Sequence, residues 1–152
     1  MPKLNFKNLL FATFFSFSLG LQAGMELSDK AEISVLTFGP YQGELYSAFG
    51  HSGIRIYDPA LNLNWVYHYG VFNFNQNNFF WNFARGKMLY SIGLAEYAKY
   101  VAHYEKNNRS VTEQVLNLSE EERQMIFDFL QENYLPENRE YNYNYVYDNC
   151  AT

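Results

Sequence analysis

The sequence predicts a single α+β domain, and three features of the chain indicate it. Several short runs alternate apolar and polar residues, which is the period of a half-buried β-strand. Two longer runs instead place apolar residues at the spacing of a helix face, and the second begins with a helix-capping pattern. No internal repeat and no linker rich in Gly, Ser or Pro divides the 152 residues, a length that corresponds to one domain.

The N-terminal segment has the pattern of a secretory signal and not of a folded element. Lys3 and Lys7 precede an apolar stretch at residues 9–21, which ends in the small-residue pattern of a cleavage site. The stretch is short for a membrane span, which needs ~20 apolar residues. We expect residues 1–23 to be a signal peptide or an N-terminal anchor, and residues 24–152 to form a domain outside the cytoplasm.

Strands dominate the first half of the predicted domain. Glu32–Phe38 is rich in β-branched residues and stops at a Gly-Pro pair. Ser52–Tyr57 ends at an Asp-Pro turn and Trp65–Tyr69 closes at a glycine, so we expect these two runs to form a hairpin. After a polar loop, Phe79–Ala84 is expected to be a short aromatic helix, and Met88–Gly93 another strand.

The second half of the predicted domain contains the two longer helices. We expect a helix over Leu94–Lys106, a strand over Val111–Leu118, and a helix that begins at Ser119. The hydroxyl of Ser119 and the side chain of Glu122 can form a capping box, in which each satisfies a free backbone amide. The apolar face predicted for this helix consists of Met125, Ile126, Phe129, Leu130 and Tyr134. The strict alternation of Tyr141–Tyr145 predicts an extended segment with tyrosines on one face.

Composition excludes one class of partner and points toward another. The net charge of −5 and the absence of a Lys/Arg cluster argue against binding to nucleic acid. Aromatic residues make up 20% of the chain, and such a surplus is common at binding surfaces and membrane interfaces. The densest apolar cluster consists of Phe72, Phe74, Phe79, Phe80, Trp81 and Phe83. Its members either pack in the core, which is the commoner case for each one singly, or contact lipid.

A lone cysteine and a histidine are the first candidates for chemistry. Asp148 and Asn149 are good N-cap residues, so a helix that starts here would lower the pKa of the Cys150 thiol and populate its thiolate. His51 lies at the opening of a predicted strand and can serve as the base that a cysteine nucleophile needs. A lone cysteine is more often a small buried hydrophobe, so spacing alone makes this pair a weak signal.

Strand register adds His68 as a third candidate. With a hairpin turn midway between residues 58 and 63, residues whose numbers sum to about 121 face each other, so that Gly53 opposes His68. His51 and Gly53 share a face because side chains alternate. This places His68 diagonally beside His51, ~7–8 Å away between backbones. A slip of one residue would instead make His68 an ordinary packing residue on the other face.

Several segments together match a known family pattern. They are Gly43–Ser52 with Arg55 and Asp58, Tyr67–Phe74, Gly86-Lys87 with Tyr90, Arg109–Val111, Glu113-Gln114, Leu116–Leu118 and Tyr141–Thr152. The most specific parts are Phe-Gly-His-Ser at 49–52 and Asp-Asn-Cys-Ala-Thr at 148–152. Over residues 32–152 the chain resembles the N-terminal periplasmic domain of the Lnb family of bacterial lipoprotein N-acyltransferases.

This resemblance implies a fold and a set of catalytic roles. The order Gly-His…Asn-Cys is similar to that of circularly permuted papain-like enzymes of the NlpC-like kind. That fold is an antiparallel sheet with packed helices. By the same analogy Cys150 is the nucleophile that forms a thioester and His51 is the general base, whereas His68 enters as the third group through its register alone.

The resemblance also implies partners and a place in the cell. Lnb proteins move a fatty acyl chain onto the free α-amino group of the diacylglyceryl-cysteine at a lipoprotein N-terminus. The expected partners are a phospholipid acyl donor, a lipoprotein acceptor and the membrane surface, in the periplasm at the inner membrane. No cofactor and no metal are expected.

The chain departs from the family pattern at its end. Relatives continue through the cysteine helix and on to a membrane part, whereas this sequence stops two residues after Cys150. We therefore expect a domain truncated before the cysteine helix, incomplete at its C-terminus and inactive alone. Two other functions stay open: a papain-like cysteine peptidase or amidase of the cell envelope, and a non-catalytic envelope binding module in which Cys150 is inert.

Overall fold

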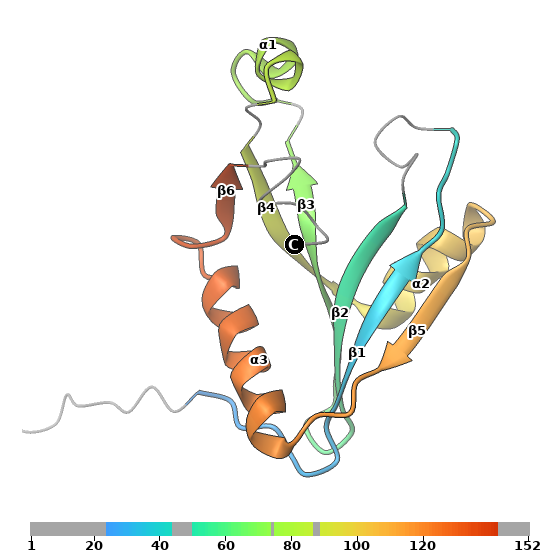
Figure 1. Ribbon diagram of the computed structural model, residues 1–152, viewed down its shortest axis with the longest axis vertical. Coiled ribbons are helices and arrows are strands. Elements are labelled where there is room, and N and C mark those ends of the chain that lie inside the picture. Colours follow the sequence, from blue (N-terminus) through green and yellow to red (C-terminus); the bar gives the residue numbers. More distant parts are fainter. Residues whose placement is uncertain (1–23, 44–49, 74, 87–88, 143–152) are drawn as a thin grey trace, which may run out of the picture.

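The computed structural model of the chain describes residues 24–43, 50–73, 75–86 and 89–142 (Figure 1). In chain order its elements are β1 (Glu32–Phe38), β2 (His51–Asp58), β3 (Leu63–Phe72), α1 (Phe79–Ala84), β4 (Leu89–Glu96), α2 (Tyr97–Lys106), β5 (Val111–Val115), α3 (Glu120–Tyr134) and β6 (Glu140–Asn142). The strands form one six-stranded sheet in the order β5-β1-β2-β3-β4-β6, and every neighbouring pair is antiparallel. The fold is therefore α+β with an antiparallel sheet and packed helices, as predicted.

Two helices cover opposite faces of the sheet, with α3 in front and α2 behind in Figure 1. The core under α3 contains Ile33, Ile56, Leu63, Tyr67, Ile92, Phe127 and Leu130. The core under α2 contains Leu36, Phe38, Val66 and Tyr104. Because side chains of a strand alternate between faces, β1 supplies Ile33 to one core and Leu36 to the other. The central strands of the sheet therefore contribute side chains both to the core under α3 and to the core under α2.

A buried carboxylate fixes the turn between β2 and β3. Asp58 is fully buried and accepts hydrogen bonds from the backbone amide and hydroxyl of Ser28 and from the amides of Ala60 and Leu61. Burial disfavours the charged form, but these hydrogen bonds outweigh it and lower the pKa of Asp58. The Asp-Pro signal at this position therefore marks a turn that also ties the segment before β1 to the sheet.

Two elements, β1 and α1, have the predicted bounds, and most of the others need correction. The strands predicted over residues 52–57, 65–69 and 88–93 are longer and extend over His51–Asp58, Leu63–Phe72 and Leu89–Glu96. The helix expected over Leu94–Lys106 begins only at Tyr97, because residues 94–96 continue β4 and pair with β3. The strand expected over Val111–Leu118 ends at Val115. In both places pairing with a neighbouring strand decides the boundary, which local spacing does not report.

The start of α3 is as predicted, and its apolar face is predicted in part: Leu130 lies in the core, and Ile126 and Tyr134 pack against it. The Ser119 hydroxyl accepts from the Glu122 amide at 3.2 Å, and the Glu122 carboxylate accepts from the Ser119 amide at 2.8 Å, which is the capping box. Met125 and Phe129, predicted to be buried, are exposed, whereas Phe127 is buried against the sheet. Phe127 and Phe129 are two residues apart, which is about 200° around a helix, so only one of them can face the sheet. Of the predicted extended segment at residues 141–145, β6 includes the start, and the rest lies outside the described residues.

Candidate functional site

His51 and His68 lie side by side on the face of the sheet that α2 covers. The pairs Ile54–Tyr67 and Asp58–Leu63 give the predicted register of β2 and β3. The two imidazole rings are 5.5 Å apart between centroids and nearly perpendicular, at 81°. The predicted neighbourhood of the two histidines is thus confirmed, and the described residues hold them at the end of the sheet where β2 begins.

Aromatic side chains surround the two imidazoles. Phe38 of β1 stacks on His51 with ring centroids 6.1 Å apart, and Tyr100 of α2 lies 4.7 Å from His68. Tyr104, one turn further along α2, stacks on Phe38 at 4.0 Å and hydrogen-bonds with the Tyr100 hydroxyl at 3.2 Å. The histidine pair therefore lies between β-strands on one side and the rings of Tyr100 and Tyr104, here called the wall of tyrosines, on the other.

Arg109 is a further group beside this pair that the sequence patterns do not single out. Its Nε donates to the Gly39 carbonyl at 2.8 Å, and its guanidinium lies 4.5 Å from the centre of the Tyr104 ring. The only sequence signal for Arg109 is its place in one of the segments that match the family pattern. Tyr100 carries no signal of its own until the bounds of α2 are known.

Both imidazoles are held in the neutral form. Burial, reinforced by the positive charge of Arg109, lowers the pKa of His51 to about 4. Burial, reinforced by the repulsion that a protonated His51 would exert, lowers the pKa of His68 to about 4. At neutral pH each ring therefore has one nitrogen that can accept a proton and one that can donate a hydrogen bond.

Two glycines with positive φ shape the backbone at the pair. Gly50, directly before His51, has φ +85°, and a Cβ there would lie 2.6 Å from the Phe38 carbonyl oxygen. Gly70 has φ +93° at the point where the register of β3 against β4 shifts by a β-bulge. Bulges redirect the side chains beside them and recur next to functional sites. Residues with a side chain would strain both positions, so the local backbone depends on glycine.

A third glycine leaves room for the His68 ring. A Cβ on Gly93 of β4 would lie 2.6 Å from Nε2 of His68 and 2.8 Å from Cγ2 of Val71. His68 and Gly93 pair across the two strands, so the imidazole lies over the glycine. The position of this ring therefore depends on glycine at residue 93 of the neighbouring strand.

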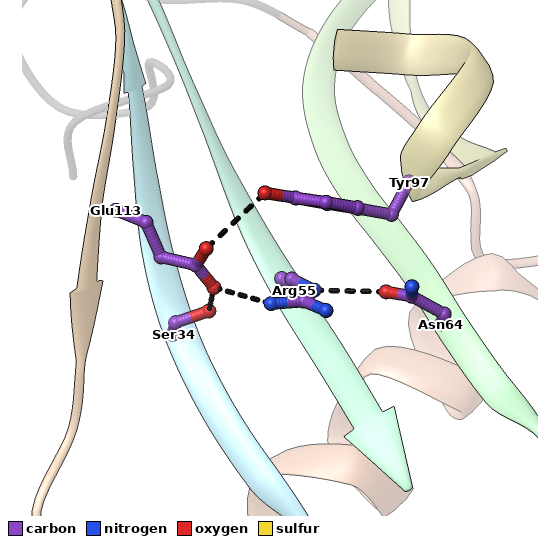
Figure 2. A network of polar contacts seen from close by, with 5 residues as sticks. All are labelled: Ser34, Arg55, Asn64, Tyr97 and Glu113. Carbon is purple, nitrogen blue, oxygen red and sulfur yellow. Dashed lines mark hydrogen bonds and ion pairs between the residues drawn. The ribbon is translucent and has the colours of Figure 1, made fainter. Parts of the chain in front are cut away.

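A polar network continues along the same face, further from the end where β2 begins (Figure 2). The Arg55 guanidinium donates to Glu113 at 2.7 Å and to the Asn64 side chain at 2.8 Å, and it lies 3.9 Å from the centre of the Tyr97 ring. Glu113 also accepts from the hydroxyls of Ser34 and Tyr97. Burial disfavours its charge, but these bonds outweigh it and lower the pKa of Glu113. The network ties β5, β1, β2, β3 and α2 together and so supports the wall of tyrosines.

Cys150 lies outside the described residues, so its pairing with His51 stays a prediction. Among the described residues no three His, Cys, Asp or Glu side chains lie close enough together to hold a metal ion. A hollow of about 680 Å³ lies instead on the outer side of α3, lined partly by Glu121, Asp128 and Glu132.

The aromatic cluster divides into packed and exposed members. Phe72 stacks on Phe79 at 6.2 Å, and both are partly buried. Phe80 and Trp81 point outward and are exposed. The side chains of Phe74 and Phe83 lie outside the described part of the chain. In that described part no helix is long and apolar enough to cross a bilayer.

Comparison with known proteins identifies a family for almost all of the predicted domain. The family model described as the Lnb N-terminal periplasmic domain matches residues 26–152. No curated protein and no solved structure matches the chain. The matched range includes every described strand and helix, both histidines and Cys150.

Proposed function

The chain belongs to the Lnb N-terminal periplasmic domain family, and from this premise we propose that it is a periplasmic thiol acyltransferase domain. Its acyl donor is a phospholipid of the inner membrane, and its acceptor is the N-terminal amine of a bacterial lipoprotein. Cys150 is the nucleophile, His51 the general base, and His68 the group that positions His51. The observation that carries the proposal is the pair of neutral imidazoles, 5.5 Å apart, at the opening of β2.

The proposed order of groups is that of a permuted papain-like fold. The strand that begins with His51 comes first, and the cysteine follows it along the chain. Geometry and roles, and not chain order, define such nucleophile–base pairs. The antiparallel sheet and its two covering helices are consistent with this arrangement.

The first half-reaction loads the enzyme. His51 accepts the proton of the Cys150 thiol, and the thiolate attacks the carbonyl carbon of the phospholipid ester. The bond from that carbon to the glycerol oxygen breaks, and His51 returns the proton to this oxygen. The products are a Cys150 thioester and a lysophospholipid.

The second half-reaction transfers the chain. The lipoprotein amine attacks the thioester carbonyl, His51 accepts the amine proton, and the carbon–sulfur bond breaks. The departing thiolate regains the proton, and an amide remains on the lipoprotein. With a pKa lowered to about 4, His51 is deprotonated at neutral pH and free to accept a proton. It becomes an efficient base only if its pKa rises toward the working pH when Cys150 is charged. The negative charge of the thiolate then stabilises the imidazolium that forms.

The test uses the full-length protein. It is incubated with phosphatidylethanolamine vesicles and a diacylated lipopeptide, and mass spectrometry follows the acyl adduct on Cys150 and the N-acylated lipopeptide. We expect Cys150→Ser and His51→Gln to lower N-acylation by ~10²-fold or more. The matched control is His103→Gln, an exposed histidine of α2, which should leave the rate unchanged.

The role of His68 needs a readout that fold damage does not reproduce. His68→Gln should lower the rate and shift the acidic limb of its pH profile, because the charge of His51 and the pKa of His68 are coupled. A lower rate with an unshifted profile would give His68 a packing role only. Full activity of His51→Gln, or release of free fatty acid with no N-acylated lipopeptide, would contradict the transferase proposal.

A further inference from the structure

The connection between β3 and β4 contains two exposed aromatic side chains. Phe80 is 84% exposed and Trp81 is 65% exposed, and both belong to α1, which lies beyond the ends of β3 and β4 (Figure 1). Phe79 packs edge-on against Phe80, with ring centroids 5.4 Å apart, and stacks on Phe72 of β3. Phe80 is therefore held at the end of the sheet by aromatic packing through Phe79, and Trp81 follows it in the same helix.

The charge of this connection is opposite to that of the chain. The chain has 16 acidic residues and a net charge of −5, yet no Asp or Glu occurs between Asp58 and Glu96. The charged residues in that interval are Arg85 and Lys87, both in the connection itself. The Arg85 guanidinium lies 5.7 Å from the centre of the Trp81 ring. We call Phe80, Trp81 and Arg85 the aromatic tip.

A second exposed apolar pair shows that exposure is not the distinguishing property. Met125 and Phe129 of α3 are 65% and 61% exposed. The hollow beside them is lined by acidic side chains, namely Glu26, Glu120, Glu121, Asp128 and Glu132. An anionic surface would be repelled there, whereas the aromatic tip offers apolar area together with the cation of Arg85.

We propose that the aromatic tip docks into the interfacial region of a bilayer that contains anionic phospholipid. Tryptophan is favoured at the headgroup level, where its ring is amphipathic. A phenylalanine beside it adds apolar area that leaves water on insertion. The Arg85 guanidinium is suited to the phosphate of a lipid headgroup. The tip projects from the end of the sheet, so it can enter a surface without any other element moving.

Docking in this orientation would place the histidine pair close to the lipid. β2 begins with His51 at the same end of the sheet, and β3 runs from His68 to Phe72 toward the tip. Four strand residues span about 13 Å, roughly twice the ~5–8 Å depth of one headgroup region, so the histidine pair would lie just above the lipid surface. This step, in which the acyl ester comes within reach of the site, rests on the proposed function, but the docking itself does not.

The two tryptophans of the chain allow a direct test. The full chain with Trp65→Phe reports Trp81 alone, and the full chain with Trp81→Phe reports Trp65 alone, which lies in the sheet. Each is mixed with phosphatidylglycerol–phosphatidylcholine vesicles whose acyl chains are brominated. We expect Trp81 to lose roughly half its emission and to shift to the blue, and Trp65 to remain unchanged. If chains bind the vesicles, as flotation shows, and the emission of Trp81 is not quenched, the proposal is overturned.

Charge reversal separates the electrostatic part. In the Trp65→Phe background, Arg85→Glu should reduce the quenching of Trp81, and Lys99→Glu, a reversal at an exposed site of α2, should not. Equal loss in both, or equal quenching on vesicles of phosphatidylcholine alone, would refute the anionic preference. Quenching without thioester formation would support docking and contradict the acyltransferase proposal. Acyl transfer in detergent, without quenching on vesicles, would support the acyltransferase proposal and contradict docking.

Discussion

The two faces of the sheet bury different kinds of side chain under their helices. The face under α3 is mainly apolar, and Ile33, Ile56 and Phe127 are fully buried there. The face under α2 carries two histidines, an arginine–glutamate pair and several tyrosines. Burying neutral histidines lowers stability at acidic pH, which an apolar face avoids. We infer that the α3 face maintains the fold and the α2 face is kept for chemistry.

The largest effect should come from the α3 face. Phe127→Ala removes a fully buried ring and should lower the free energy of unfolding by about 3–5 kcal/mol. The matched control is Phe129→Ala, two residues along, whose ring faces solvent and which should change stability by less than ~0.5 kcal/mol. Urea unfolding measures both, and equal losses would break the assignment of the buried face.

The α2 face should show itself in the pH dependence of stability. Each histidine has a pKa of about 4 in the folded protein and 6.5 in the unfolded chain, so the unfolded chain binds more protons between pH 4 and pH 6.5. The stability present above pH 6.5 is then lost as the pH falls toward 4, by about 3 kcal/mol per imidazole.

The measurement for this pH effect is urea unfolding at pH 7 and at pH 4.5, in the wild type and in the double variant His51→Gln, His68→Gln. Carboxylates titrate in both proteins, so the difference between them isolates the imidazoles. The double variant should lose less stability than the wild type. An identical loss in the two proteins would mean that the imidazoles are not held neutral.

An intermediate effect is expected from the network that supports the α2 face. Glu113→Gln leaves Arg55 partly buried beside a neutral amide and should cost about 1–3 kcal/mol. The exposed pair of Lys99 and Glu96 is the control, because Glu96→Gln should cost less than ~1 kcal/mol. Thermal or urea unfolding compares the two, and an equally small effect of both would make the network a surface feature.

A smaller effect on stability is expected at Gly93, with a larger one on function. Gly93→Ala puts a Cβ against the flexible ends of His68 and Val71, which can move aside at a cost of about 1 kcal/mol. The displaced imidazole should then lower acyl transfer well beyond the loss in stability. Activity together with urea unfolding tests this, and unchanged activity would show that the position of His68 does not matter.

Local signals predicted more of this fold than non-local ones. The Asp58–Pro59 turn and strict alternation set the register of β2 and β3, and with it the neighbourhood of His51 and His68. The capping box fixed the start of α3 for the same reason, since its two partners are three residues apart. Features that depend on one turn or one helix end can therefore be predicted from the sequence.

Contacts between distant segments were not predictable in this way. Arg55 and Glu113 are 58 residues apart and meet across β1, so no spacing rule connects them. Tyr100 reaches His68 only because α2 packs on that face of the sheet. One edge of the α3 face was misassigned because Phe127 and Phe129 are equally apolar, and only packing against the sheet chooses between them.

The reactivity of the one cysteine tests the central claim most directly. In the full-length protein, Cys150 should react with iodoacetamide at pH 7 faster than free cysteine, because His51 can accept the thiol proton and the resulting imidazolium stabilises the thiolate. His51→Gln should remove that advantage, and His103→Gln should keep it. A wild-type thiol no more reactive than free cysteine, and indifferent to His51→Gln, would contradict the acyltransferase account and favour an envelope binding module.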